Sequence, residues 1–304
     1  MKKIIAVVAL GAVAFGGYSY ANYYVSKEAR KDVDKQLLDL HAQTGLDVRY
    51  QELSTDLFNK GVALESVVVN SVEGDKIADI ARVEMVGFDP QKVTEHARFT
   101  IDGMTLQGAA LEGLEDLEGE QINLITEFNY QQSNGDADAQ TVIEAGNIAD
   151  IKFNFAMTNS QELMALSEQL NAIAEQEQNG QATMQQQLVL QSQLMTAMMN
   201  LVPKSMSFEL KNKGKLKDIL ERTVTAQGMT LEQFQMHAQQ QLSVSPAPVV
   251  LREAALGFIN GTEQFSVSVT VPEQTTVAQL NQKIIAMADP EELAKYFDLQ
   301  ATGK

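Results

Sequence analysis

The feature that most constrains the fold is an alternation of apolar and polar side chains, which begins at Leu46 and continues to about Thr158. Successive side chains of a β-strand point to opposite faces, so a period of two predicts strands with one apolar face each. Turn residues at Glu73-Gly74-Asp75 and Asn134-Gly135-Asp136 separate such strands, and the Asn-Gly pair tolerates two positive φ values. We therefore expect a meander of antiparallel strands. The clearest alternations place Ile122, Leu124, Phe128 and Tyr130 on one face of a strand, and Ile151, Phe153, Phe155 and Met157 on one face of another.

Between Asn159 and Val202 the apolar residues recur every three or four positions, which is the spacing of one helix face. Asn159 is expected to cap the first helix, with Glu162 at its third position, and Asn179-Gly180 to end it. We predict an antiparallel helical hairpin over 159–203. Its candidate surface for an apolar ligand or a partner consists of adaptable methionines: Met184, Met195, Met198 and Met199. A helix pair that packs on the sheet accounts for the same pattern and is the simpler interpretation.

The last third of the chain, residues 204–304, mixes the two periods. Thr230 and Asp289 stand where helix N-caps are expected, and Pro290 follows Asp289 at the first helical position. The predicted elements are strands over 206–210 and 265–271 and helices over 216–224, 231–242, 251–259, 277–288 and from 290 onward. The fold class is therefore α+β, with strands of the last third completing the earlier sheet. A separate small domain is the alternative.

An apolar segment follows the charged start Met1-Lys2-Lys3 and extends from Ile4 to Val25. As a helix, these 22 residues would measure roughly 33 Å, enough to cross a hydrocarbon core of about 30 Å. Amphipathic tyrosine rings would then lie near one membrane interface: Tyr18, Tyr20, Tyr23 and Tyr24. We expect a retained signal anchor. A signal peptide cleaved after Ala21 is one alternative, and a soluble core helix is another.

A helix over Ser26–Thr44, ended by Gly45, is expected to continue this anchor beside the membrane. Basic residues outnumber acidic ones within 1–35, which suits anionic lipid headgroups, although Lys and Arg flank signal segments in general. More of these basic residues follow the apolar segment than precede it, which by itself favours a cytoplasmic body. We nevertheless expect a single-pass protein of the bacterial inner membrane with its body in the periplasm, because Lys-Lys is typical of a signal start. The expected regions are 1–25 (anchor), 26–45 (membrane-proximal helix), 46–158 (sheet), 159–203 (hairpin) and 204–304 (mixed).

Composition excludes several kinds of chemistry. The chain has no cysteine, so disulfides, thiolate catalysis and Cys-ligated metals are absent. Its formal charge of -17 repels phosphate backbones, which makes nucleic acid an unfavourable partner. The histidines His41, His96 and His237 are far apart in the sequence, and no hydrolase elbow, Walker loop or dinucleotide fingerprint occurs. We predict no catalytic residue, no metal site and no cofactor.

Two acidic stretches resemble cation sites in part. Asp136-Ala137-Asp138 resembles the start of a calcium loop, but it lacks the later carboxylates and the bidentate glutamate. A solvated turn is the simpler interpretation. The acidic stretch within 112–120 has the composition to bind cations or a basic partner, and a charged connection between strands is again simpler. Its acidic residues are Glu112, Glu115, Asp116, Glu118 and Glu120.

The order of several segments resembles a known family. They are the Lys-Lys start with its anchor, Thr44-Gly45-Leu46-Asp47-Val48-Arg49-Tyr50, Asp56-Leu57-Phe58 before the strand Val62 to Val72, Phe208-Glu209-Leu210-Lys211-Asn212-Lys213-Gly214, Ala226-Gln227-Gly228-Met229-Thr230, and the strand Val267 to Val271 before Pro272. In these the chain looks like the YdgA-like bacterial proteins of unknown function. The resemblance implies a membrane-anchored periplasmic protein with a β-rich body, distantly similar to AsmA-type envelope proteins that handle lipids. It implies no catalytic residue.

Three functions remain open from the sequence. The first is a non-enzymatic envelope protein that binds an apolar ligand, such as a lipid, or a partner protein through its β-rich body. The second is a structural or regulatory module that acts through protein contacts. The third is a carboxylate-dependent hydrolase with acids from separate strands. The first is our leading hypothesis, because it accounts for the anchor, the one-faced strands and the methionine-rich hairpin.

Overall fold

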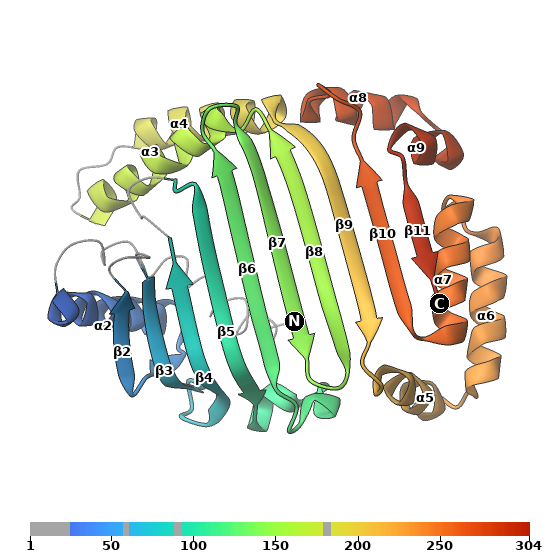
Figure 1. The fold of residues 1–304 in the computed structure, drawn as a ribbon, viewed down its shortest axis with the longest axis horizontal. Coiled ribbons are helices and arrows are strands. Elements are labelled where there is room, and N and C mark those ends of the chain that lie inside the picture. Colours follow the sequence, from blue (N-terminus) through green and yellow to red (C-terminus); the bar gives the residue numbers. More distant parts are fainter. Residues whose placement is uncertain (1–24, 57–60, 88–92, 179–183) are drawn as a thin grey trace. The chain divides into compact units, whose positions relative to one another are not determined.

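The computed structural model describes residues 25–56, 61–87, 93–178 and 184–304, which belong to two compact units (Figure 1). Unit 1 contains the described residues up to Tyr130 together with Met164–Gln191, and unit 2 contains Gln131–Leu163 and Ser192–Lys304. Both units are built on antiparallel strands with helices, so the predicted α+β class is confirmed. No helix of the described ranges is long and apolar enough to cross a membrane. The predicted anchor, Ile4 to Val25, lies outside these ranges except for Val25.

Unit 1 begins with helix α2 (Val25–Thr44), and Gly45 ends it as predicted, with a φ of 77°. Its strands are β1 (Asp47–Arg49), β2 (Glu52–Asp56), β3 (Gly61–Asn70), β4 (Lys76–Val86), β5 (His96–Leu106) and β6 (Ile122–Gln131). They lie in the order β1-β3-β4-β5-β6, and β2 also pairs with β3. Two short 3-10 helices, η1 (Gly108–Leu111) and η2 (Glu115–Leu117), connect β5 to β6.

The core of unit 1 is one face of β3, β4 and β5, where Val69, Ile80 and Ile101 are 0%, 2% and 1% exposed. In β3 and β5 the alternation of apolar and polar side chains shifts by one residue halfway along the strand, where Ser66 and Gly103 adopt positive φ values of 52° and 63°. The strand registers place both residues at the level of Ala81 on β4. These irregular positions keep apolar side chains on the same face along the whole strand.

Unit 2 contains β7 (Asp136–Ala145), β8 (Ala149–Thr158), β9 (Val202–Asn212), β10 (Gln264–Thr270) and β11 (Gln300–Gly303), each antiparallel to the next. Strand β8, predicted as part of the earlier sheet, pairs with β9 of the last third, so strands of the last third extend that sheet as predicted. Strand β11 was not predicted from the sequence.

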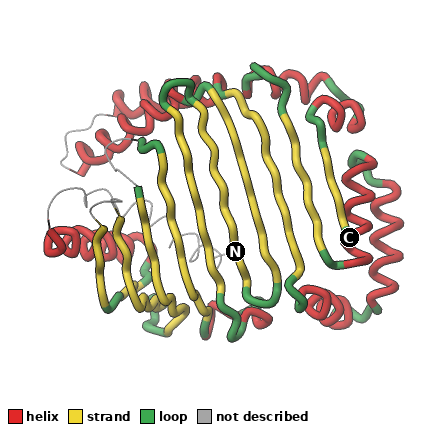
Figure 2. Tube along the Cα trace, viewed as in Figure 1, coloured by secondary structure: helices red, strands yellow, loops and turns green. Residues whose placement is uncertain are grey.

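The helices follow the predicted order with shifted ends. They are α3 (Gln161–Gln178), α4 (Met184–Asn200), α5 (Leu216–Ala226), α6 (Leu231–Val244), α7 (Val249–Gly261), α8 (Val277–Ala286) and α9 (Pro290–Tyr296). Thr230 and Asp289 cap α6 and α9 as predicted. In unit 2, helices α5, α8 and α9 lie beyond the ends of the strands, and α6 and α7 lie along the β11 edge (Figure 2).

The predicted capping role of Asn159 is wrong. Its φ is 58°, and its side-chain amide donates to the carbonyl oxygen of Asn200 at 2.9 Å. Asparagine tolerates the left-handed conformation that turns the chain sharply after β8, so α3 begins only at Gln161. The predicted helix end at Asn179-Gly180 lies outside the described residues.

Helix α7 packs on β11 through glycine. A Cβ atom at Gly303 would overlap the carbonyl oxygen of Ala254 and lie 2.7 Å from the backbone nitrogen of Phe258. A Cβ atom at Gly257 would likewise overlap the carbonyl oxygen of Gly303. The two backbones can approach this closely only because neither glycine carries a side chain.

Candidate apolar binding surface

The strand registers of unit 2 align apolar side chains across three neighbouring strands. Phe153 on β8 faces Phe208 on β9, and Phe208 faces Val267 on β10. The rows on either side are equally apolar. We call the whole set the apolar face; it consists of Ile151, Phe153, Phe155, Met206, Phe208, Leu210, Phe265, Val267 and Val269.

The opposite face of the same strands is polar. Asn154 accepts a hydrogen bond from Gln140 at 2.7 Å and donates one to the hydroxyl oxygen of Ser207 at 2.9 Å. Ser266 and Thr302 form a hydroxyl pair at 2.7 Å. Side chains on this face therefore hydrogen-bond to one another and to solvent, whereas the apolar face offers only van der Waals contact.

The apolar face is only partly buried. Phe153 is 40% exposed and Met206 is 45% exposed, whereas Ile101, on the core face of unit 1, is only 1% exposed. Helix α7 covers the β10 and β11 end, where Phe258 contacts Phe265 edge-on with ring centroids 6.0 Å apart. Over β8 and β9 every residue of this face keeps contact with solvent. Contiguous exposed apolar surface of this kind marks interaction sites in soluble domains.

The predicted methionine surface lies on α4. Met195, Met198 and Met199 are 56%, 46% and 40% exposed, while the side chain of Met184 is outside the described set. Ala197, on the other side of the helix, is buried at 2%. Helix α4 thus has one apolar side that packs and one that faces solvent, and a binding role for the methionines stays a prediction.

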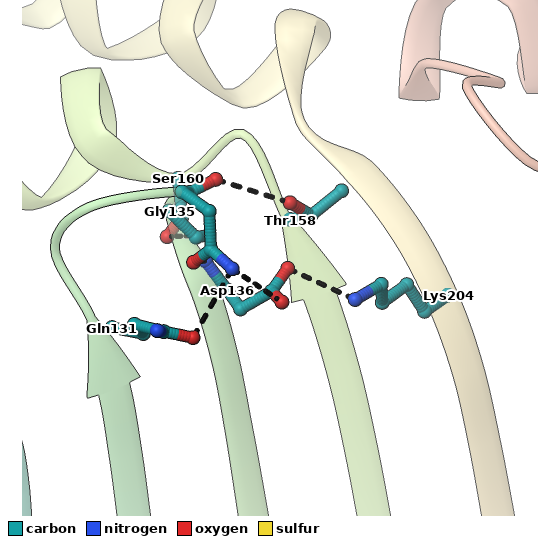
Figure 3. Close-up of polar contacts among 7 residues, drawn as sticks. Gln131, Gly135, Asp136, Thr158, Ser160 and Lys204 are labelled. Atoms are coloured by element: carbon teal, nitrogen blue, oxygen red, sulfur yellow. Dashed lines mark hydrogen bonds and ion pairs between the residues drawn. The ribbon is translucent and has the colours of Figure 1, made fainter.

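Asp136, the first residue of the stretch that resembled a calcium loop, begins β7 directly after a turn (Figure 3). The Asp136 carboxylate accepts a hydrogen bond from the Asn134 amide at 2.9 Å and pairs with Lys204 Nζ at 2.9 Å. The backbone nitrogen of Asp136 donates to Asn134 Oδ1 at 2.9 Å. Gly135 has a positive φ of 69°, but Asn134 does not, because its side chain closes the turn instead. The geometry is that of a solvated turn whose carboxylate contacts the protein itself.

The same contacts set the charge of Asp136. Its carboxyl pKa is lowered, chiefly by the hydrogen bond from Lys204, with smaller contributions from Thr158 and Asn134. The turn is fixed from its other side by Ser160, whose hydroxyl donates to the carbonyl oxygen of Gly135 at 2.7 Å. The ion pair between Asp136 and Lys204 therefore links β7 to β9 at the protein surface.

Across 25–56, 61–87, 93–178 and 184–304, no cluster of three or more His, Asp or Glu side chains could hold a metal ion. The histidines lie on different elements and each contacts a local group: His41 the carbonyl of Leu46, His96 the side chain of Asn129, and His237 the side chain of Gln241. The acidic stretch within 112–120 forms the connection around η1 and η2, where Glu115 accepts from the Gly113 backbone at 2.8 Å.

A family model described as "Uncharacterized protein" matches residues 142–304, which is more than half of the chain. The chain belongs to this family. The matched range includes all of strands β8 to β11 and therefore every residue of the apolar face. No curated protein matches the sequence.

Proposed function

We propose that this chain is a non-enzymatic envelope protein that binds the acyl part of a lipid on the apolar face of unit 2. The observation that carries the proposal is the exposure of that face over β8 and β9, with Phe153 and Met206 both at 40% or more. The apolar face consists of aromatic, aliphatic and thioether side chains with no polar group among them, so it offers van der Waals contact to hydrocarbon and no hydrogen bond to a polar ligand.

The energetics favour such a ligand. Burial of one methylene group contributes about 0.8 kcal/mol, so six methylenes on the apolar face would contribute about 5 kcal/mol before association costs. The neighbouring side chains would gain from the same burial, because their own exposed area is removed from water. A longer acyl chain therefore reaches useful affinity without any hydrogen bond.

The proposed location is the bacterial inner membrane, with Ile4 to Val25 as the anchor and the body in the periplasm. The charged start and the length of the apolar segment support it, as does the resemblance to YdgA-like proteins. The whole chain has a formal charge of -17 and its body is acidic, so anionic headgroups repel it, and close contact with a membrane has to come through the anchor or an apolar surface. Reporter enzymes fused after Lys304 test this topology, and activity in the cytoplasm would overturn it.

Lipid binding is tested with two neighbouring substitutions on β9. Met206→Glu places a charge on the apolar face, and Ser205→Glu places the same charge on the exposed polar side of the same strand. Full-length variants are purified in a mild non-ionic detergent, and the lipid that co-purifies per protein is measured by mass spectrometry. The amount of lipid that co-purifies around the proposed membrane anchor should be the same in both variants, so a difference between them reports on the apolar face. We expect less lipid with Met206→Glu alone, and equal lipid content in the two would contradict the proposal.

A second candidate function is a protein-interaction module, and the exposed methionines of α4 favour it. Met195→Lys and Met198→Lys would charge that side of the helix while leaving the apolar face of unit 2 unchanged. Crosslinking in intact cells that recovers one defined partner, and loses it in these variants with lipid content unchanged, would support this function over the first.

A further inference from the structure

A second candidate site lies in unit 1, in an open pocket of about 800 Å³ between α2, β1 and the turn that joins β3 to β4. This volume falls within the range of roughly 300 to 1,000 Å³ that holds small molecules in proteins. The pocket is separate from the apolar face, since all of its lining residues belong to unit 1.

One end of the pocket is cationic and aromatic. The Arg30 guanidinium lies over the ring of Tyr50, 5.7 Å from its centroid, and Arg49 lines the pocket one residue before Tyr50. The Tyr50 hydroxyl donates to Asp34 Oδ1 at 2.6 Å. Burial, and then the bond to Asp34, raise the pKa of Tyr50 to about 12, so the ring stays neutral and fixed as a platform for Arg30.

Aliphatic side chains also line the pocket, beside the polar residues His41, Asp47 and Ser71. Leu37 and Leu38 follow Arg30 by seven and eight positions on α2, which places them roughly 11 Å further along the helix axis. Leu38 is 68% exposed and Val72, from the β3 to β4 turn, is 73% exposed. A molecule that fills the pocket therefore meets both guanidinium groups and aliphatic side chains.

The carboxylates of the lining are already engaged. Asp34 holds the Tyr50 hydroxyl, and Asp47 pairs with Arg49 at 2.7 Å. A cationic ligand would have to displace these contacts. A guanidinium has five N–H donors, so Arg49, whose side chain is 74% exposed, has donors beyond the one that pairs with Asp47. Guanidinium groups bind phosphate through parallel charge-assisted hydrogen bonds, which are stronger than bonds between neutral groups.

We propose that this pocket binds an anionic amphiphile through its phosphate group, with the phosphate at Arg30 and Arg49 and the hydrocarbon chain along Leu37, Leu38 and Val72. A phospholipid and a free phosphate share the head chemistry, and the apolar end distinguishes them. The site does not depend on lipid binding by unit 2, because no residue is common to the two surfaces.

The experiment uses the absence of tryptophan from the chain. Leu38→Trp introduces a single tryptophan, which can be excited selectively over the tyrosines, at an exposed aliphatic position of the pocket in the full-length protein in non-ionic detergent. Inorganic phosphate, glycerol 3-phosphate and dihexanoylphosphatidate are titrated separately. We expect a saturable change in emission with dihexanoylphosphatidate at a concentration at least about tenfold below that needed for inorganic phosphate. Equal affinity for these two probes, or no response to any of them, would overturn the assignment of an amphiphile.

The matched variants are Arg30→Gln and Lys31→Gln in the Leu38→Trp background. Both remove one exposed positive charge from neighbouring positions of α2, but only Arg30 lines the pocket. Loss of a charge-assisted hydrogen bond predicts binding of dihexanoylphosphatidate about ten- to a hundredfold weaker with Arg30→Gln and unchanged with Lys31→Gln. Arg49→Gln provides a second test of the same end, and circular dichroism checks that each variant is folded. Equal effects of Arg30→Gln and Lys31→Gln would refute the site.

Discussion

Gly257→Ala should destabilise the protein, although alanine is the better helix former. In the middle of a helix the substitution gains about 1 kcal/mol of propensity. Here the new Cβ atom would overlap the carbonyl oxygen of Gly303 and lie 2.9 Å from its carbon, so α7 and β11 have to move apart. Overpacking against backbone costs about 1 to 3 kcal/mol, which leaves a net loss of up to about 2 kcal/mol. Urea unfolding followed by circular dichroism measures this loss.

Asn260→Ala is the control on the same helix. Asn260 is exposed, so its replacement reports propensity alone and should gain a few tenths of a kcal/mol. If Gly257→Ala proves as stable as the parent protein or more so, close packing of α7 on β11 is refuted. A loss with Gly257→Ala and a gain with Asn260→Ala would establish that contact with β11, and not helix propensity, decides the sign.

Three further substitutions test individual contacts. Asp34→Asn should lower the pKa of Tyr50 from about 12 towards 10.0, as measured by NMR of the tyrosine ring carbon. Because folding raises this pKa, Tyr50 contributes to the stability of the native protein below pH 10, and the contribution is lost as the pH rises through about 12. Lys204→Gln should raise the pKa of Asp136 towards 3.8, as measured by NMR of the carboxyl carbon. Because folding lowers this pKa, Asp136 contributes to the stability of the native protein above pH 3.8, and the contribution is lost as the pH falls through the lowered pKa. Thr230→Ala should cost about 1 kcal/mol in urea unfolding, because it removes one half of the capping box of α6.

Each of these three has a result that contradicts it. A Tyr50 pKa that does not move in Asp34→Asn would show that burial alone raises it. An Asp136 pKa unchanged by Lys204→Gln would separate the carboxylate from Lys204 in solution. Thr276→Ser serves as the capping control at α8, because serine keeps the hydroxyl, and a loss there equal to that of Thr230→Ala would assign both effects to the threonine methyl group.

Local patterns were enough to predict most elements. The alternation of Phe153 with its neighbours predicted β8, and the spacing of Thr230 and Asp289 before apolar runs predicted where α6 and α9 begin. The phase change in β3 is also visible in the sequence, since Val62 and Leu64 are followed by Val67 and Val69. A strict period of two does not predict this change, because the alternation shifts by one residue at Ser66, whose φ is 52°.

Long-range contacts were beyond the sequence patterns. Strand β11 has the sequence Gln-Ala-Thr-Gly, with no alternation of large apolar residues, and it forms because β10 and α7 both pack on it. The pocket of unit 1 joins Arg30, Tyr50 and Val72, which are distant in the chain and share no motif. The apolar face itself was predictable from alternation, but its exposure was not, because exposure depends on what packs against the face.

The strands of the two units show why exposure, and not composition, separates a core from a candidate binding surface. On the unit 1 face, Val69 and Ile101 are at most 1% exposed, so any ligand would first have to open that core and lose its packing. On the unit 2 face, Phe153 and Met206 already contact water, so hydrocarbon can add to them while every strand pair stays intact. A ligand that binds only the folded state stabilises it by about 2.7 kcal/mol at a hundredfold excess over its Kd. If a lipid binds the apolar face, such stabilisation should reach the amides of β8 and β9 before those of β3 to β5, and hydrogen exchange with and without lipid would measure the difference.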